Sequence, residues 1–173
     1  MQFRLARKED LSRLLDMYRE IRTEMDRNGI TIWDDYYPFQ LLKDDINKER
    51  LYLLEREGDF LSVLAMTDSN PGERAVEWAD SNGKAAYIER FGTNVKYRRK
   101  GIGYAMLQYA MTEAQEKGFN YLRLFSAAQN DPAMRLYKKA GFNQMSGEFL
   151  DEIEENVYLL EYGFEIDLCA DSI

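Results

Sequence analysis

The hydrophobic pattern of the chain changes period repeatedly, and this alternation is the feature that most limits its fold. Apolar residues recur at helical spacing over residues 11–28 and 101–117, which predicts two amphipathic helices. Strands are predicted from the short apolar runs at 2–5, 51–57, 60–67, 85–93 and 121–127. Strands and helices that intermix along one chain of 173 residues predict a single α/β domain.

Turn residues place the remaining boundaries. Gly58-Asp59 lies between two apolar runs and predicts a hairpin, and Pro38 suits the first turn of a helix that reaches about Lys48. Asn130-Asp131-Pro132 predicts a helix start, with an end at Gly141. Residues 69–84 are polar and predict a long loop. Final strands are predicted at 142–149 and 157–162, on either side of the acidic stretch 150–156.

Charge and composition exclude several classes of function. The net charge of −8 disfavours binding to nucleic acid or to an anionic membrane, because both attract basic surfaces. No apolar run is long enough to span a bilayer, and residues 1–10 lack a signal-peptide core. Cys169 is the single cysteine, so an internal disulfide is excluded and a reducing, cytoplasmic location is expected.

The chain contains no histidine, and this limits its chemistry. Ser-His-Asp and Cys-His catalysis are excluded, as is zinc bound through histidine, and no metal is expected. Proton transfer near neutral pH must therefore use a carboxylate, tyrosine, lysine, water or the backbone.

A basic, glycine-containing turn stands immediately before the helix at 101–117. In "RRKGIG", Arg98, Arg99 and Lys100 precede Gly101 and Gly103. Helix-start N–H groups lack intrahelical partners, and glycine lets an anion approach them closely, so the turn suits a phosphate. The sequence lacks the endings of a Walker loop and of a dinucleotide fingerprint. On spacing alone, a solvated turn with a helix cap remains equally compatible.

Two segments together resemble the GNAT superfamily of N-acetyltransferases. "VKYRRKGIG" is similar to the family's signature for the coenzyme A pyrophosphate, and "NDPAMRLYKKAGF" to a later element of the family. The likeness is strongest over residues 86–142. It implies a mixed, mostly antiparallel central sheet flanked by helices. It also implies acetyl-CoA as co-substrate and direct attack by an amine, without a covalent enzyme intermediate.

The resemblance implies roles for individual residues. Tyr137 is the candidate acid for the departing thiolate, with core packing as the alternative. Glu89 is the candidate base, although it could simply pair with Arg90 or be replaced by water. Neighbours in a strand face opposite sides, so one of this pair is expected to be buried or to face a pocket. Coenzyme A contacts are expected from Phe91, Thr93, Arg98, Arg99, Lys100, Gly101, Ile102, Gly103, Tyr104 and Asn130.

The acceptor is the least determined part of this hypothesis. Trp33, Asp34 and Tyr37 belong to an aromatic and acidic connector that suits a cationic amine, although a packed loop is equally compatible. A small-molecule amine is the expected partner. The alternatives are a protein amine and a CoA-binding sensor without turnover. The tail, residues 164–173, could add a strand, cover a sheet edge or contact a second subunit, which leaves a homodimer open.

Overall fold

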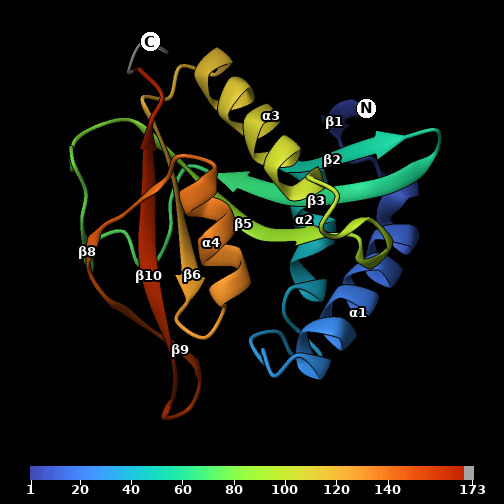
Figure 1. Cartoon of the computed structure of the whole chain (residues 1–173), viewed down its shortest axis with the longest axis horizontal. Helices are drawn as coiled ribbons and strands as arrows, with labels where there is room; N and C mark the ends of the chain where they lie inside the picture. The colour runs from blue at the N-terminus through green and yellow to red at the C-terminus, as the bar shows by residue number, and fades with distance from the viewer. Residues whose placement is uncertain (170–173) are drawn as a thin grey trace. The chain divides into compact units, whose positions relative to one another are not determined.

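The computed structural model describes residues 1–169, and these fall into two compact units (Figure 1). The first unit comprises Met1–Met66 and Glu89–Met106. The second comprises Thr67–Ile88 and the chain from Leu107 onward. Each unit therefore draws on two separate stretches of sequence. The end of the predicted tail, residues 170–173, lies outside the described residues.

Strands of the first unit follow one another across a sheet in the order β1, β2, β3 and β5. Antiparallel pairing joins β1 (Gln2–Leu5) to β2 (Leu51–Arg56) and β2 to β3 (Asp59–Thr67). The predicted hairpin is confirmed, with its turn one residue earlier than expected. Glu57 and Gly58 both have positive φ, 53° and 85°, as in the tight turns that match the twist of paired strands.

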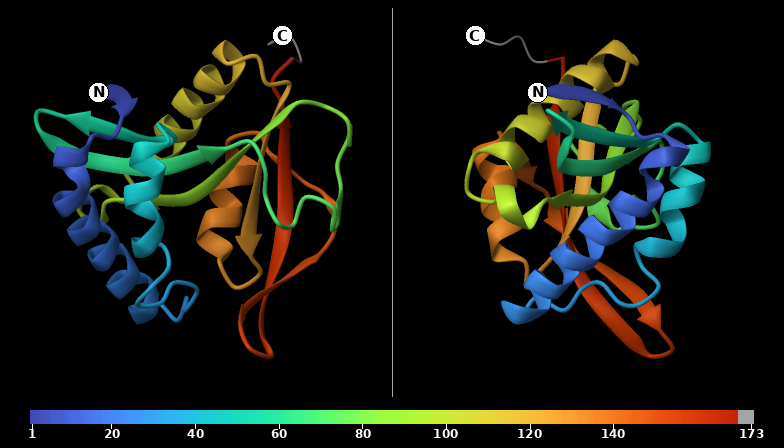
Figure 2. Two further views of the ribbon diagram at one scale, coloured as in Figure 1. Left: turned by 180° about the vertical axis from the view of Figure 1, so that it is seen from behind. Right: turned by 90° about the vertical axis from the view of Figure 1, so that its right-hand side faces the viewer.

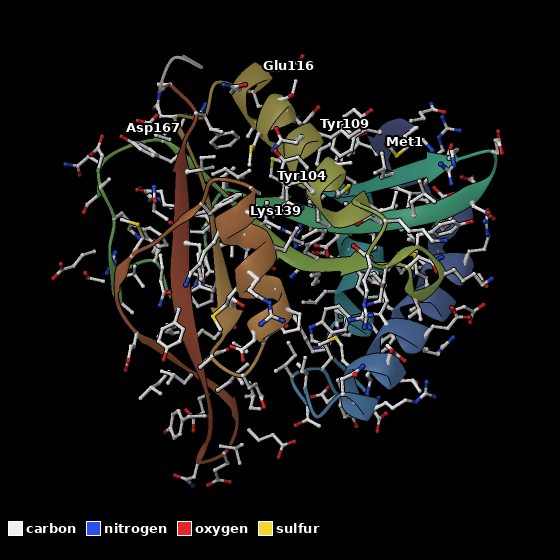
Figure 3. The ribbon with its side chains drawn as sticks, viewed as in Figure 1. Met1, Tyr104, Tyr109, Glu116, Lys139 and Asp167 are labelled. Atoms are coloured by element: carbon white, nitrogen blue, oxygen red, sulfur yellow. The ribbon has the colours of Figure 1, made fainter. Side chains whose placement is uncertain are left out.

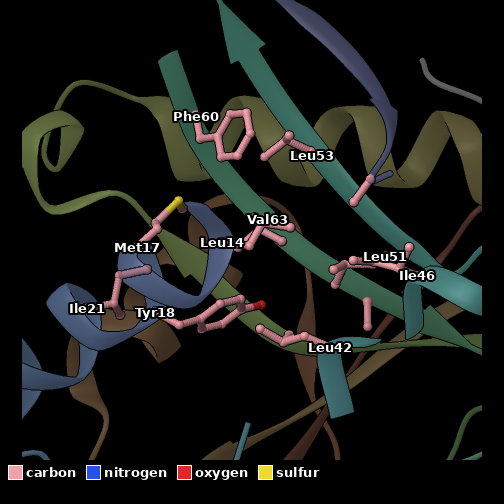
Figure 4. Packing of buried hydrophobic residues seen from close by; sticks show 12 residues of the cluster. Leu14, Met17, Tyr18, Ile21, Leu42, Ile46, Leu51, Leu53, Phe60 and Val63 are labelled. Carbon is pink, nitrogen blue, oxygen red and sulfur yellow. The ribbon is translucent and has the colours of Figure 1, made fainter. Parts of the chain in front are cut away.

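Helices α1 (Leu11–Arg27) and α2 (Leu42–Asn47) cover one face of this sheet (Figure 2). The residues of β2 and β3 on this face are apolar, and they alternate along each strand except between Phe60 and Val63, where the pairing register shifts. Figure 4 shows side chains of α1 meeting those of the strands. The buried cluster consists of Ala6, Leu14, Met17, Tyr18, Ile21, Leu42, Ile46, Leu51, Leu53, Phe60, Val63 and Ala65.

The helix predicted from Pro38 to about Lys48 is shorter than expected. A 3₁₀ turn, η2, occupies Phe39–Leu41, and only Leu42–Asn47 is α-helical. The amide of Leu41 donates to the Pro38 carbonyl, an i to i+3 bond that belongs to a tighter helix. At the other end, Glu49 has a φ of 51°, which stops helical hydrogen bonding.

In the second unit, the first residues of β5 (Ala85–Thr93) run parallel to β6 (Tyr121–Ala127). The long strand β10 (Val157–Asp167) is antiparallel to β6 and also pairs with β7 (Asn143–Gln144) and β9 (Phe149–Glu154). Helix α3 (Ile102–Glu116) begins in the first unit and belongs to the second from Leu107 onward, and α4 spans Asp131–Lys139 in the second unit. The expectation of a mixed, mostly antiparallel sheet with helices is confirmed. Among residues 1–169, no helix is long and apolar enough to cross a membrane.

Three predictions for the second unit are wrong in detail. The strand expected at 142–149 is divided into β7 and β8 (Ser146–Gly147), and the long loop contains β4 (Val76–Glu77). The pairing of β4 with β8 requires glycine at position 147. Gly147 has a φ of 102°, and a Cβ there would lie only 2.5 Å from the Ala75 carbonyl oxygen. The acidic stretch 150–156 is mostly strand β9, since it is one arm of an exposed hairpin and needs no apolar face.

Replacing Leu14 by Ala tests the core of the first unit. Leu14 is fully buried, so we expect Leu14→Ala to lower the free energy of unfolding by about 2–5 kcal/mol. Its neighbour Leu15 only packs against the cluster and is partly exposed, so Leu15→Ala should cost clearly less. Urea denaturation of both variants measures the difference, and equal losses would contradict this packing.

Candidate functional site

The basic turn lies in the first unit, between β5 and α3. After β5, a short 3₁₀ helix, η3 (Val95–Tyr97), is capped by the Asn94 side chain, which accepts from the Lys96 amide at 3.0 Å. Arg99 and Gly101 then adopt positive φ, 59° and 77°. The Ala105 amide donates to the Gly101 carbonyl at 3.0 Å and closes the first turn of α3. The positive end of the helix dipole therefore stands at this turn.

The three cations of the turn differ in their surroundings. Arg98 Nη1 lies 3.3 Å from Glu24 Oε1, so its charge is partly matched. Arg99 and Lys100 are exposed and form no ion pair with any of residues 1–169; the Lys100 ammonium lies 5.4 Å from the centre of the Tyr97 ring. Tyr104 projects from α3 and is 38% exposed (Figure 3). Arg99 and Lys100 are thus the cations available to an anionic ligand.

The end of β5 is fixed by contacts to β3 and α1. Ser62 Oγ donates to the Gly92 carbonyl at 2.8 Å and lies 3.4 Å from the Thr93 hydroxyl. The Asn94 amide donates to the Leu61 carbonyl at 2.9 Å. A Cβ on Gly92 would lie 2.8 Å from Ile21 Cδ1, so a larger residue there would require the end of the Ile21 side chain to shift. Phe91 and Thr93, expected to bind through their backbone, belong to this fixed segment.

Arg90 is buried, as was expected of one member of this pair, but Glu89 and Arg90 do not face opposite sides, so the expected alternation is wrong. Arg90 has a φ of 52°, which interrupts the alternation of the strand. The two side chains meet instead, with Arg90 Nη1 2.6 Å from Glu89 Oε2. The predicted pairing of these neighbours therefore occurs, and Glu89 as a base stays a prediction.

Arg90 is buried, only 5% exposed, and its charge is matched by Asp45 of α2. Asp45 is fully buried, with Oδ2 2.7 Å from Arg90 Nε and Oδ1 2.6 Å from Arg50 Nε. The Tyr18 hydroxyl donates to the Arg90 carbonyl at 2.5 Å. Burial alone would lower the pKa of Arg90, but nearby negative charge, including Asp45 and Glu89, raises it. Burial likewise raises the pKa of Tyr18 well above its ordinary value.

The candidate acceptor residues lie in the same unit. The Trp33 ring lies 5.4 Å from that of Tyr18 and packs against the core cluster. Asp34 uses Oδ1 for the turn, where it accepts from the amides of Tyr36 and Tyr37 at 2.7 and 2.6 Å. Tyr37 lies close enough to Arg90 to help raise the pKa of its guanidinium. Trp33 and Tyr37 thus lie near the Tyr18–Arg90 pair, whereas Oδ1 of Asp34 is occupied by the hydrogen bonds of its own turn.

Asn130 and Tyr137 lie in the second unit. Asn130 caps α4, since its side chain accepts from the Ala133 amide at 3.4 Å. Tyr137 is 7% exposed, and its ring lies 6.2 Å from Phe142 and 5.7 Å from Phe164. Burial, aided by the charge of Glu161, raises the pKa of the Tyr137 phenol well above its ordinary value. The phenol therefore keeps its proton over the neutral range, as a proton donor must.

Sequence reasoning missed Asp45, Arg90 and Tyr18 as a connected group. A signal for Asp45 did exist. It stands three residues after Leu42 and directly before Ile46, so helical spacing puts its carboxylate on the apolar face of α2. A charge at such a position requires a buried partner. The partner itself could not be read from sequence, because Arg90 is 45 residues away.

A family model described as the acetyltransferase (GNAT) family matches residues 13–142, which is more than half of the chain. The chain belongs to the acetyltransferase (GNAT) family. The matched range includes β5, the basic turn, α3 and α4, and so contains residues of both units.

Curated relatives of this GNAT chain resemble it only in part. A [ribosomal protein bS18]-alanine N-acetyltransferase of Escherichia coli (strain K12) is 30% identical over 89 residues, which cover 44% of this chain and 60% of that protein. N-acetyltransferase family 8 member 3 of Rattus norvegicus is 26% identical over 126 residues, which cover 68% of this chain and 52% of that protein. The chain spans less than two thirds of the length of these relatives.

Solved structures show the same fold. The crystal structure of a GNAT-family acetyltransferase from Streptococcus agalactiae superposes with a TM-score of 0.82 at 18% identity, covering 96% of this chain and 94% of that one. At this level of identity, the similarity supports the GNAT architecture rather than a particular substrate.

Neutralising Asp45 tests the buried pair. Asp45→Asn keeps the volume but removes the buried carboxylate that Arg90 and Arg50 share and leaves Arg90 with Glu89 alone, so we expect a loss of about 3–5 kcal/mol in the free energy of unfolding. Asp44, its neighbour, is a matched control because it pairs with Lys48 and Arg50 while 48% exposed. Asp44→Asn should cost less than about 1 kcal/mol. Thermal and urea denaturation give both values, and similar losses would contradict the proposed importance of the pair.

Proposed function

We propose that this GNAT protein is an acetyl-CoA-dependent N-acetyltransferase that acetylates a primary amine, with a small molecule as the preferred acceptor. The observation that carries the proposal is the start of α3. There, the left-handed backbone at Arg99 and Gly101, the helix dipole and two unmatched cations occur together. Because the family match contains residues of both units, we further propose that the two units belong to one acetyltransferase domain.

Coenzyme A fits this turn on chemical and steric grounds. A Cβ at Gly101 would meet nothing within 4 Å, so the space beside the backbone is open to an anion. Arg99 and Lys100 would donate charge-assisted hydrogen bonds to the pyrophosphate, together with amides of Ile102, Gly103 and Tyr104. Arg98 would have to share its charge with Glu24. Backbone groups of Phe91 and Thr93 would hold the pantetheine arm as an added strand, and Asn130 would contribute a further contact.

Acetyl-CoA supplies the acetyl group and a sulfur leaving group. The acceptor nitrogen would attack the carbonyl carbon, a C–N bond would form and the C–S bond would break. Tyr137 would give its phenolic proton to the departing sulfur, consistent with the raised pKa of the phenol. Glu89, or water, would take the proton that the amine loses. Alignment of the two reactants itself contributes up to about 7–11 kcal/mol.

The acceptor would meet Trp33, Tyr37 and Glu89, whose aromatic faces and carboxylate suit a cationic amine before it loses its proton. Asp34 can contribute only the oxygen that its own turn does not use. A protein amine is the second candidate, favoured by the E. coli relative, whose name specifies alanine of a ribosomal protein. A CoA sensor without turnover is a third.

Release of free thiol from acetyl-CoA tests the function directly. We expect turnover with at least one small primary amine in a panel that also contains N-terminal peptides and lysine peptides. Turnover on peptides alone would replace the small-molecule acceptor by a protein amine. Tight binding of coenzyme A with no turnover on any amine would overturn the enzymatic proposal in favour of a sensor.

Removing one cation of the turn tests the pyrophosphate contact. Arg99→Ala and Lys100→Ala should each raise the Kd for coenzyme A about tenfold, because a hydrogen bond to a charged group contributes on the order of 1.5–3 kcal/mol. Pantetheine, which lacks the pyrophosphate, should bind these variants as it binds the parent. Lys96→Ala, on the exposed side of η3, is the control and should leave both affinities unchanged. Calorimetry measures them, and equal weakening of pantetheine would refute the assignment.

Replacing Tyr137 by Phe separates catalysis from packing. The ring contacts to Phe142 and Phe164 survive in Tyr137→Phe, so the Kd for coenzyme A should stay within about threefold. Loss of the acid should lower kcat by about 100-fold or more. Because burial raises the pKa above 10, the parent enzyme should show no loss of proton donation up to that pH. Parallel loss of kcat and of affinity would point to packing alone.

A further inference from the structure

The second unit contains a cavity of about 420 Å³ that the proposed acetyl transfer does not use. Its walls come from the segment between β3 and β5 and from β5 and β6. The side chains that matter are Asp68, Glu73, Arg74, Trp78, Tyr87 and Arg123.

This cavity lies on the face of the sheet opposite α4. Tyr137 of α4 contacts Phe164, which is directly opposite Leu124 in the β10–β6 pair. Arg123 precedes Leu124 in β6, so its side chain points to the other face, where its register partner is Glu165. Trp78 packs on that second face, 5.6 Å from the ring of Phe125. The cavity is therefore separate from the candidate acid Tyr137.

Arg123 forms the buried base of the cavity, and several contacts hold its side chain in place. It is 3% exposed, and its Nε lies 2.7 Å from Glu165 Oε2. Nη2 donates to the Asp80 carbonyl at 2.7 Å, and Nη1 donates to the Tyr87 hydroxyl at 3.3 Å. The guanidinium also lies 4.5 Å from the centre of the Trp78 ring. With Glu165 beside it, the charge of Arg123 is already matched.

The segment between β3 and β5, which forms the opposite wall of the cavity, is also held in place by several contacts. Trp78 Nε1 donates to the Glu73 carbonyl at 2.7 Å, and the Ala79 amide donates to Glu165 Oε1 at 3.1 Å. Val76 and Glu77 pair with β8. The cavity is thus preformed, as binding sites for small molecules usually are.

The unmatched charge of the cavity is negative on balance, since two carboxylates and one guanidinium besides that of Arg123 line it. Within residues 1–169, the side chains of Asp68, Glu73 and Arg74 make no hydrogen bond or ion pair. Asp68 and Arg74 are exposed, whereas Glu73 is half-buried. Burial raises the pKa of Tyr87 against the opposing effect of Arg123, and the carboxylates of Glu73 and Glu165 raise it further, which agrees with Glu73 lying close to this ring. The innermost free charge is therefore that of Glu73.

We propose that this cavity binds a small organic cation, an amine or ammonium compound, with Glu73 as its counter-ion. Trp78 and Tyr87 would line its apolar part. The Arg123 guanidinium already lies over the Trp78 and Tyr87 rings, so these rings would give the ligand apolar contact, and the partly buried Glu73 carboxylate would match its charge. The site is independent of the acetyl-transfer proposal, since it uses none of the same residues.

Butylammonium and butyrate, which have the same length and opposite charge, are the probes. We expect saturable binding of butylammonium in calorimetry and at least tenfold weaker binding of butyrate. In Trp33→Phe, which leaves Trp78 as the single tryptophan, butylammonium should change the tryptophan emission with the same Kd.

Two substitutions locate the site. Glu73→Gln should weaken butylammonium binding at least tenfold. Glu77→Gln removes an exposed carboxylate that does not line the cavity and should leave the Kd unchanged. Melting temperatures would confirm that both variants fold. Equal binding of the two probes, equal weakening by both substitutions, or no saturable binding would each overturn the proposal, whatever the outcome of the thiol-release assay.

Discussion

The buried contact between Asp45 and Arg90 is the interaction on which the first unit depends most. A carboxylate with no exposure cannot stay charged at reasonable cost unless a cation lies beside it. Here two guanidiniums do so, and they come from different parts of the chain: Arg50 directly before β2, and Arg90 within β5. One side chain of α2 thereby fixes the helix against both strands. An Arg at a φ of 52° costs on the order of 1–3 kcal/mol, so this backbone conformation persists only where surrounding contacts stabilise it. Two contacts do this for Arg90: the Asp45 carboxylate pairs with its side chain, and the Tyr18 hydroxyl donates to its carbonyl.

The second unit also contains a buried ion pair, which stabilises a different kind of segment. Arg123 and Glu165 are both about 4% exposed, and they connect neighbouring strands to the segment that carries Trp78. Buried ion pairs of this kind add little net stability compared with apolar residues, but breaking one is costly. We infer that these two pairs select one arrangement of their segments among several. In the first unit, that arrangement is the irregular end of β5. In the second, it is a polar segment that would otherwise have few apolar contacts to hold it.

Local sequence pattern was sufficient for most of the fold. The periodicity of α1 and α3, the turn before β3 and the cap of α4 are short-range signals, and each element appears close to its expected bounds. Errors arose where distant residues decide the structure. Glu89 and Arg90 were expected on opposite faces because a regular strand alternates, and the exception depends on Asp45 in another element. The division of residues 142–149 depends on Gly147 meeting Ala75, a contact between segments 72 residues apart in sequence. The candidate ligand residues of the basic turn, by contrast, are contiguous, which is why sequence alone could group them.

A chain without histidine must divide acid and base work between groups with very different properties. Tyr137 is suited to donation because its buried phenol resists ionisation. Glu89 presents a different problem, since its carboxylate is already engaged with Arg90 at 2.6 Å. To take a proton from an ammonium, it has to release part of that contact, and the cost to Arg90 is limited because Asp45 remains beside it. The Asp45–Arg90 pair therefore does more than shape β5. In the proposed mechanism, it would allow Glu89 to exchange its contact with Arg90 for a substrate proton without leaving a bare charge in the protein interior.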